Sequence, residues 1–257
     1  MIKIVSGKIF VAEDQGNMQR WKGARPNNRE YVVKGLTYYM SLSEDMIVLG
    51  MSDGLVKILR QDIGSEVRTM QCEDSGVQQK TIHVNLSISQ NILVTGTSNG
   101  TDNGQVTVWD ITSKARLYRG APHGSPWVTG VCAHSDLVAT GAEDGSLAIL
   151  TTKPRVSMEC LLEGVGEITD LDGDDMRLLV ATEEDMKLYS IETRSQPQLV
   201  NTATTGYVCS CALAFPFAAA TGGSRQAGLV IWDMVGCVPV RQLHTHLNFF
   251  FIHIKES

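Results

Sequence analysis

The chain has 257 residues, of which 43% are hydrophobic and 19% are charged, and this composition excludes a disordered protein. A formal net charge of −6 argues against general binding to nucleic acids or anionic membranes, because those partners attract cationic surfaces. Six cysteines occur without a Cys-x-x-Cys pair, and no apolar run approaches membrane-spanning length. We therefore expect a globular protein of the cytoplasm or nucleus, without a signal peptide, a membrane span, a metal or a cofactor.

In chain order, the sequence repeats one hairpin-containing unit. In each unit an aromatic residue or a leucine follows the hairpin turn by about five positions. These marker residues are Trp21, Leu59, Trp109, Leu150, Tyr189 and Trp232. Their spacing of roughly 40 residues is typical of a repeated four-stranded β unit.

Each unit has the same four predicted strands. An alternating apolar strand comes first and is predicted at 36–42, 81–88, 127–133, 167–171 and 207–213. The first strand of the hairpin follows at 46–50, 92–96, 137–141, 178–182 and 217–222. The marker lies in the second strand of the hairpin, and an outer strand comes after it at 30–34, 67–71, 115–118, 158–162 and 238–243. Helical spacing is not sustained over three turns anywhere, so we expect almost no helix.

The clearest of these hairpins resemble WD40 repeats, which form β-propellers. The resemblance is carried by Thr95-Gly96 with Val106-Thr107-Val108-Trp109-Asp110, by Ala139-Thr140-Gly141, and by Val230-Ile231-Trp232-Asp233. It implies an all-β fold, a WD40-type propeller with about six recognisable four-stranded blades. We expect this propeller to occupy residues 1–246, followed by an atypical tail at 247–257.

The resemblance also implies structural residues. A WD40 blade often joins a His before its inner strand, a Ser or Thr in the next strand, an Asp in the hairpin turn and the Trp through hydrogen bonds. The fourth unit comes nearest to this set, with His123, Thr140 and Asp144, but Leu150 stands in its Trp place. Trp21, Trp109 and Trp232 fill the Trp place in other units. No unit has the complete set.

The sequence alone does not determine the number of blades. Six hairpins are recognisable, whereas WD40 propellers most often have seven blades, and such rings close by sharing strands between their ends. Either the tail at 247–257 closes a six-bladed ring, or the chain is a truncated form of a seven-bladed protein. We favour truncation, because three successive phenylalanines do not alternate as a strand requires.

No sequence motif in the chain organises a nucleophile, a metal or a phosphate. The acidic run at 170–175 fails as a calcium loop, since Asp175 stands where a glycine is needed, and we expect it to form a turn. His244 and His246 alternate on one strand face, where we expect a structural role. We therefore expect a protein that is not an enzyme. A propeller hydrolase that uses the carboxylates of 170–175 at the channel mouth is the alternative.

Candidate binding residues lie in the loops. In WD40 architecture, the loops that precede the inner strands and the hairpin turns surround one mouth of the channel and bind proteins or peptides. Trp127 and Arg119 flank such a loop, and both residue types are frequent interface anchors. Tyr207 and Arg225 are further candidates for the same role. An equal alternative is that Trp127 packs between blades.

These observations favour a non-enzymatic scaffold that binds other proteins or peptides through its mouth, within a multi-subunit complex. A substrate receptor of a ubiquitin ligase complex is a narrower alternative. Neither Trp109-Asp110 nor Trp232-Asp233 continues into the Trp-Asp-x-Arg motif of some such receptors.

Overall fold

The computed structural model spans residues 1–257 and describes all of them except 1, 6–7, 13–16, 23–24, 33–36, 44, 52–54, 61–65, 72–82, 99–103, 223–227, 245–253 and 256–257. For strand residues 2–38, 71, 83–85, 98, 243–244 and 254–255, only the backbone is described. Every helix or strand in this described part of the chain is a β-strand. The all-β prediction is therefore confirmed.

The strands form six sheets, and within each sheet four consecutive strands pair antiparallel in chain order. The first sheet contains β1 (Ile2–Val5), β2 (Lys8–Ala12), β3 (Asn17–Lys22) and β4 (Arg25–Val32), and the second contains β5 (Thr37–Leu42), β6 (Met46–Met51), β7 (Leu55–Arg60) and β8 (Glu66–Gln71). The third contains β9 (His83–Ser89), β10 (Ile92–Ser98), β11 (Gln105–Asp110) and β12 (Arg116–Gly120), and the fourth contains β13 (Val128–His134), β14 (Leu137–Ala142), β15 (Leu147–Thr151) and β16 (Ser157–Leu162). The fifth contains β17 (Ile168–Gly173), β18 (Arg177–Thr182), β19 (Asp185–Ser190) and β20 (Gln198–Thr204), and the sixth contains β21 (Val208–Ala214), β22 (Phe217–Gly222), β23 (Gly228–Asp233) and β24 (Val238–His244).

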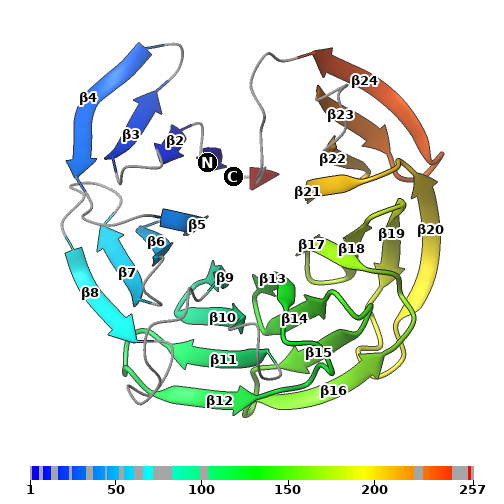
Figure 1. Ribbon diagram of the computed structural model, residues 1–257, viewed down its shortest axis with the longest axis horizontal. Helices are drawn as coiled ribbons and strands as arrows, with labels where there is room; N and C mark the ends of the chain where they lie inside the picture. Colours follow the sequence, from blue (N-terminus) through cyan, green and yellow to red (C-terminus); the bar gives the residue numbers. More distant parts are fainter. Residues whose placement is uncertain are drawn as a thin grey trace.

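The six sheets are arranged around a central axis, as Figure 1 shows. In each sheet the first strand lies nearest the axis and the fourth lies at the outer edge (Figure 1). This radial arrangement of four-stranded antiparallel sheets is that of a β-propeller, in which each sheet is a blade. We call β5, β9, β13, β17 and β21 the inner strands.

A β-bulge marks the same place in every sheet. The register between the third and fourth strands shifts at Trp21, Leu59, Trp109, Leu150, Tyr189 and Trp232. These are the six marker residues of the sequence repeat. A bulge bends a strand and increases its twist. The outer part of each sheet therefore bends at the marker residue that the sequence spacing located.

In the fourth and fifth sheets the second strand is the most buried. β14 is buried at every position, and β18 at every position except its first. Neighbouring sheets cover both faces of these strands, which explains why their sequences are apolar without alternation. One core cluster, for example, joins Leu137 and Ile149 of the fourth sheet to Ile168 and Leu178 of the fifth.

Glycines at the ends of second strands make room for the next sheet. A Cβ atom on Gly96 would lie 2.5 Å from Val128 Cγ1, and a Cβ atom on Gly141 would lie 2.6 Å from Ile168 Cγ2. Val128 and Ile168 are the first residues of the following inner strands β13 and β17. The Thr-Gly pairs of the repeat therefore reflect close packing between successive sheets.

Replacing Gly141 by Ala should destabilise the protein. The added methyl group would force Ile168 out of its place, which we expect to cost about 1–3 kcal/mol in the free energy of unfolding, measured by urea denaturation. Gly236→Ala is the matched control, because its Cβ would meet nothing closer than 3.4 Å. Equal stability of the two variants would contradict this account of the packing.

Side-chain oxygens connect the inner strands to one another. Ser41 Oγ accepts the amide N–H of Ile88 at 3.2 Å, and Ser87 Oγ accepts that of Ala133 at 3.0 Å. Ser135, directly after β13, donates its amide N–H to Ser89 Oγ at 3.1 Å. In β21, Cys211 N donates to Asp170 Oδ2 at 2.9 Å and Leu213 N donates to Asp172 Oδ2 at 2.8 Å. These bonds satisfy backbone donors of strands whose inner edges pair with no other strand.

The acidic run at 170–175 is not a turn as a whole. Asp170 and Asp172 lie within β17, and only the residues from 174 to 176 connect it to β18. Asp174 forms that turn by accepting the amide N–H groups of Met176 and Arg177, both at 2.8 Å. The prediction failed for Asp170 and Asp172 because they serve as acceptors for the next sheet, a role invisible in the local sequence.

The C-terminal part of the chain returns to the axis. β25 (Ile254–Lys255) pairs parallel with β1, with Ile254 opposite Ile4 and Lys255 opposite Val5. β25 also contacts β21, so it lies between the first and last sheets, and the two chain ends are adjacent in Figure 1. The three phenylalanines of the tail and the pair His244 and His246 lie outside the residues whose side chains are described.

Candidate functional site

One face of the ring carries both the hairpin turns and the loops that lead into the inner strands. Backbone hydrogen bonds fix these two kinds of loop to each other. Val165 N donates to Gly145 O at 3.0 Å, and Gly206 N donates to Glu184 O at 2.9 Å. The corresponding bond between the third and fourth sheets runs from Gly104 N to Ser125 O at 2.9 Å. We call the opening of the channel on this face the mouth.

Three side chains occupy equivalent places at the mouth. Trp127, Glu167 and Tyr207 each immediately precede the first residue of an inner strand, β13, β17 and β21 respectively. The carbonyl oxygens of Trp127 and Glu167 each accept the amide N–H of a hairpin-turn residue, from Glu143 and Glu183, both at 3.2 Å. The backbone at these places is therefore held in a repeated geometry.

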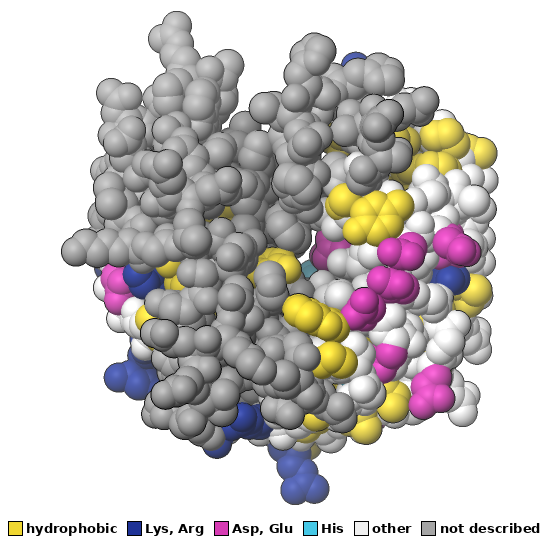
Figure 2. All heavy atoms as spheres, in the orientation of Figure 1, with side chains coloured by type: hydrophobic (Ala, Val, Ile, Leu, Met, Phe, Trp, Pro, Cys, Tyr) yellow, Lys and Arg dark blue, Asp and Glu magenta, His cyan; other side chains and the backbone are white. Residues whose placement is uncertain are grey.

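The aromatic side chains at these places are exposed. Trp127 has a relative accessibility of 36% and Tyr207 one of 46%, whereas most apolar residues of the inner strands are buried. Glu143, Glu167 and Glu183 are exposed as well. Figure 2 shows acidic side chains gathered beside the channel opening, next to exposed hydrophobic side chains. We call Trp127, Glu143, Glu167, Glu183 and Tyr207 the acidic–aromatic surface.

The carboxylates of this surface influence one another. Partial burial, Glu183 and Glu143 all raise the pKa of Glu167 above its ordinary value. Burial, Cys209, Glu183 and Glu167 raise the pKa of Tyr207. Burial is the largest cause of both shifts, and the neighbouring carboxylates add to it because like charges disfavour a further ionisation.

The structure brings together only part of the predicted binding set. Trp127 and Tyr207 lie at the mouth, while Arg119 is an exposed residue of the outer strand β12, where it pairs with Thr107. Arg225 and the side chain of Trp21 lie outside the described residues. The three glutamates were not predicted, although the recurrence of one loop position every 40 or so residues, at 127, 167 and 207, was a signal that would have found Glu167.

The predicted structural residues of the fourth sheet form a hydrogen-bonded chain. His123 is 2% exposed, with Nε2 2.9 Å from Thr140 Oγ1 and Nδ1 2.6 Å from Ser146 Oγ. The Ser146 hydroxyl donates to Asp144 Oδ1 at 2.5 Å. Ser146 thus stands between His123 and Asp144, a link that the sequence analysis did not include.

This arrangement sets the proton positions on the imidazole. Because the Ser146 hydroxyl donates to Asp144, its oxygen accepts the proton of His123 Nδ1, and Nε2 accepts from Thr140. This assignment of Nε2 as an acceptor holds for the neutral ring, which the low pKa of His123 favours near pH 7. Burial lowers the pKa of His123 to about 4, although Asp144 opposes the shift.

The stability of the protein should depend on pH through His123. Its pKa of about 4 in the folded state is below the ordinary value of 6.5, so between these values the unfolded chain binds a proton that the folded chain does not. The contribution is complete above pH 6.5 and is lost as the pH falls toward 4, by at most about 3 kcal/mol. Unfolding free energies of wild type and His123→Gln, measured across this range, should differ in slope. Parallel curves would contradict the buried neutral imidazole.

The Trp places of the repeat are occupied in different ways. Trp109 Nε1 donates to Thr95 Oγ1 at 3.3 Å, which reproduces the Trp–Thr part of the implied hydrogen-bonded set. Leu150, in the same place of the fourth sheet, is fully buried. Trp232 is half-buried and packs against the core between the fifth and sixth sheets. These residues contribute to packing and not to the mouth.

The channel carboxylates are engaged in structural bonds. Asp170 Oδ2 accepts both the Ser210 hydroxyl at 2.8 Å and the Cys211 amide at 2.9 Å. Across the channel, burial and then Asp170 raise the pKa of Tyr39 to about 12. In the part of the chain that the structure describes, no group of three or more His, Cys, Asp or Glu side chains has an arrangement that could hold a metal ion.

Removing the Asp170 carboxylate should therefore lower stability. Asp170→Ala leaves the amide of Cys211 and the hydroxyl of Ser210 without this acceptor, which we expect to cost about 1–3 kcal/mol. Asp170→Asn retains an acceptor oxygen and should cost less. Urea unfolding of both variants measures the difference. An Asp170→Ala protein as stable as wild type would contradict a structural role for this carboxylate.

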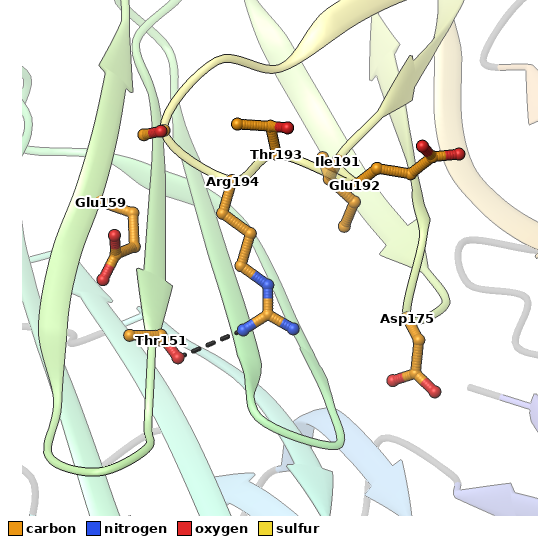
Figure 3. A pocket seen from close by; sticks show the side chains of 8 residues that line it. Thr151, Glu159, Asp175, Ile191, Glu192, Thr193 and Arg194 are labelled. Atoms are coloured by element: carbon orange, nitrogen blue, oxygen red, sulfur yellow. Dashed lines mark hydrogen bonds between the residues drawn. The ribbon is translucent and has the colours of Figure 1, made fainter.

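A second hollow lies away from the mouth, between the fourth and fifth sheets (Figure 3). It has a volume of about 520 Å³ and is lined by Thr151, Glu159, Asp175, Ile191, Glu192, Thr193, Arg194 and Ser195. Arg194 reaches toward Thr151 in Figure 3 and donates to its hydroxyl at 3.2 Å. Its other terminal nitrogen pairs with Asp136 Oδ1 at 2.6 Å. Arg194 thus links two sheets, and this one cationic side chain among the lining residues is already paired with a carboxylate.

No protein-family model and no curated protein matches this sequence. Solved structures do match. A chain of a mitotic checkpoint complex has a TM-score of 0.80 at 15% identity, over 99% of this chain and 80% of that one. The computationally designed Ika8 protein has a TM-score of 0.67 at 15% identity, over 100% of this chain and 90% of that one.

Likeness at this level of identity establishes the fold, and the chain is a β-propeller. Its six sheets, repeated bulges and fixed mouth loops define a rigid ring of repeated units. In the described part of the chain no helix is long and apolar enough to cross a membrane.

Proposed function

We propose that this chain is a WD40-type propeller that acts as a non-enzymatic scaffold and binds protein partners at its mouth. The observation that carries the proposal is the exposure of Trp127 and Tyr207 at equivalent places of the mouth. Exposed large aromatic residues on a rigid support are the usual anchors of protein interfaces, because they bury much area with little loss of side-chain freedom.

The preorganised backbone supports this role. The loops of the mouth are fixed to the hairpin turns by backbone hydrogen bonds of 2.9–3.2 Å that recur from sheet to sheet. A surface held in this way loses little conformational entropy when a partner binds. One of the solved chains with the same fold belongs to a mitotic checkpoint complex, a multi-protein assembly, which is consistent with protein partners.

The absence of catalysis is part of the proposal. The rival function, a hydrolase, would use the carboxylates of 170–175. Asp170 and Asp172 instead accept backbone amide protons from β21, and Asp174 accepts those of its own turn. A carboxylate that is held by such bonds is a poor general base, because the bonds stabilise its ionised form. No specific feature of the described residues favours the ubiquitin-ligase alternative over the general scaffold.

Trp127→Ala should weaken partner binding without unfolding the ring. Truncation of an interface anchor costs about 2 kcal/mol or more, which corresponds to a roughly 30-fold or greater rise in Kd. Affinity capture with wild type and variant identifies partners whose recovery depends on Trp127, and titration of a purified partner then gives both Kd values.

Phe217→Ala is the matched control, since Phe217 is 45% exposed and lies at the other end of the sixth sheet, in the first residue of β22. It should leave capture unchanged. A loss of several kcal/mol in the unfolding free energy of Trp127→Ala would instead assign Trp127 to the packing between sheets.

A further inference from the structure

The acidic–aromatic surface has a composition that selects among protein partners. Trp127 and Tyr207 belong to the loops before β13 and β21, and the loop before β17, between them in the ring, carries Glu167. The hairpin turns beside these loops add Glu143 and Glu183. Two aromatic rings therefore flank a group of three carboxylates that repel one another.

Lys187, in the third strand of the fifth sheet, is engaged by other partners than these glutamates. Lys187 Nζ donates to Val165 O at 2.5 Å and pairs with Asp185 Oδ1 at 3.1 Å. Both side chains of this pair are about one-fifth exposed, so the charge of Lys187 is compensated by Asp185. Among the described residues, no ion pair between a cation and Glu143, Glu167 or Glu183 is formed.

This charge decides which occupant fits the aromatic anchors. An apolar segment laid over Trp127 and Tyr207 would strip water from the glutamates without replacing it, which is unfavourable. An acidic segment or a nucleic acid would be repelled. A segment with Lys or Arg side chains offers the carboxylates opposite charges and offers the two rings cations that can lie over their faces.

We propose that the acidic–aromatic surface binds a basic peptide segment of a partner protein, with Lys or Arg side chains between Trp127 and Tyr207 and in contact with Glu143, Glu167 and Glu183. This inference rests on the scaffold function proposed above and specifies the chemistry of its partner. The aromatic rings anchor the segment, and the carboxylates select its charge.

Selection from a library of short random peptides, with the full-length purified protein as bait, tests this inference. Peptides recovered by wild type but not by Trp127→Ala should be enriched in Lys and Arg. The affinity of one such peptide is then measured by fluorescence anisotropy for wild type, Glu167→Gln, Glu183→Gln and the control Glu192→Gln. Glu192 is exposed and lines the hollow away from the mouth.

Each mouth variant should bind the selected peptide about two- to fivefold more weakly than wild type, as expected for the loss of one exposed ion pair. Glu192→Gln should bind as wild type does. Binding to wild type should weaken as NaCl is raised, because salt screens exposed charges, and the double variant Glu167→Gln with Glu183→Gln should show a smaller salt dependence.

Neutral or acidic peptides that depend on Trp127 would overturn the inference about charge while leaving the scaffold function intact. Basic peptides that bind equally well to Trp127→Ala and to both glutamine variants would place basic binding elsewhere and also overturn it. If partner capture itself is independent of Trp127, the proposed function fails together with this inference. Circular dichroism of every variant separates these results from a loss of fold.

Discussion

Each of the third, fourth and fifth sheets packs against the sheets on both sides, and this double coverage governs what their sequence can be. It requires second strands that are apolar on both faces, as in β14 and β18. It requires glycine where the next inner strand begins, as at Gly96 and Gly141. It also leaves the inner strands with unpaired edges near the axis, where serine and aspartate side chains bond the neighbouring backbone. A fold with one solvated face would need none of these features.

Much of this architecture could be predicted from the sequence, because it depends on short-range patterns. The marker residues were located by their distance from a turn, and all six coincide with a bulge between the third and fourth strands. The bulge is present at Leu59, Leu150 and Tyr189 as well, where the marker residue is not a tryptophan. The prediction failed at Asp170 and Asp172, which it assigned to a turn and which lie in β17. Their conformation depends on hydrogen bonds to the next sheet, which is distant in the sequence.

The candidate site was predictable only in part, for a related reason. Trp127 and Tyr207 could be named because large aromatic residues before an inner strand are unusual in type. The glutamates beside them are common surface residues. Only Glu167 has a sequence signal, its place in the recurrence at 127, 167 and 207, and nothing local separates Glu143 and Glu183 from Glu163 or Glu192. What distinguishes Glu143, Glu167 and Glu183 is their convergence from two sheets, which depends on the backbone bonds between loop and hairpin turn. In the same way, Ser146 joins His123 to Asp144 through an orientation that spacing alone does not reveal.

Four of the bonds that reach from one inner strand region to the previous one form two pairs, and the chain separation is equal within each pair. Ala133 and Ser135 bond to residues 46 positions earlier, and Cys211 and Leu213 bond to residues 41 positions earlier. A one-residue insertion inside an inner strand would shift its side-chain acceptors relative to the amides of the next inner strand. It would also shift the strand's own amides relative to the acceptors of the previous one. An insertion in a loop would change the separation and leave the phase intact. The ring can thus exchange its loop sequences for others of different length, which makes it a suitable frame for grafting new recognition segments.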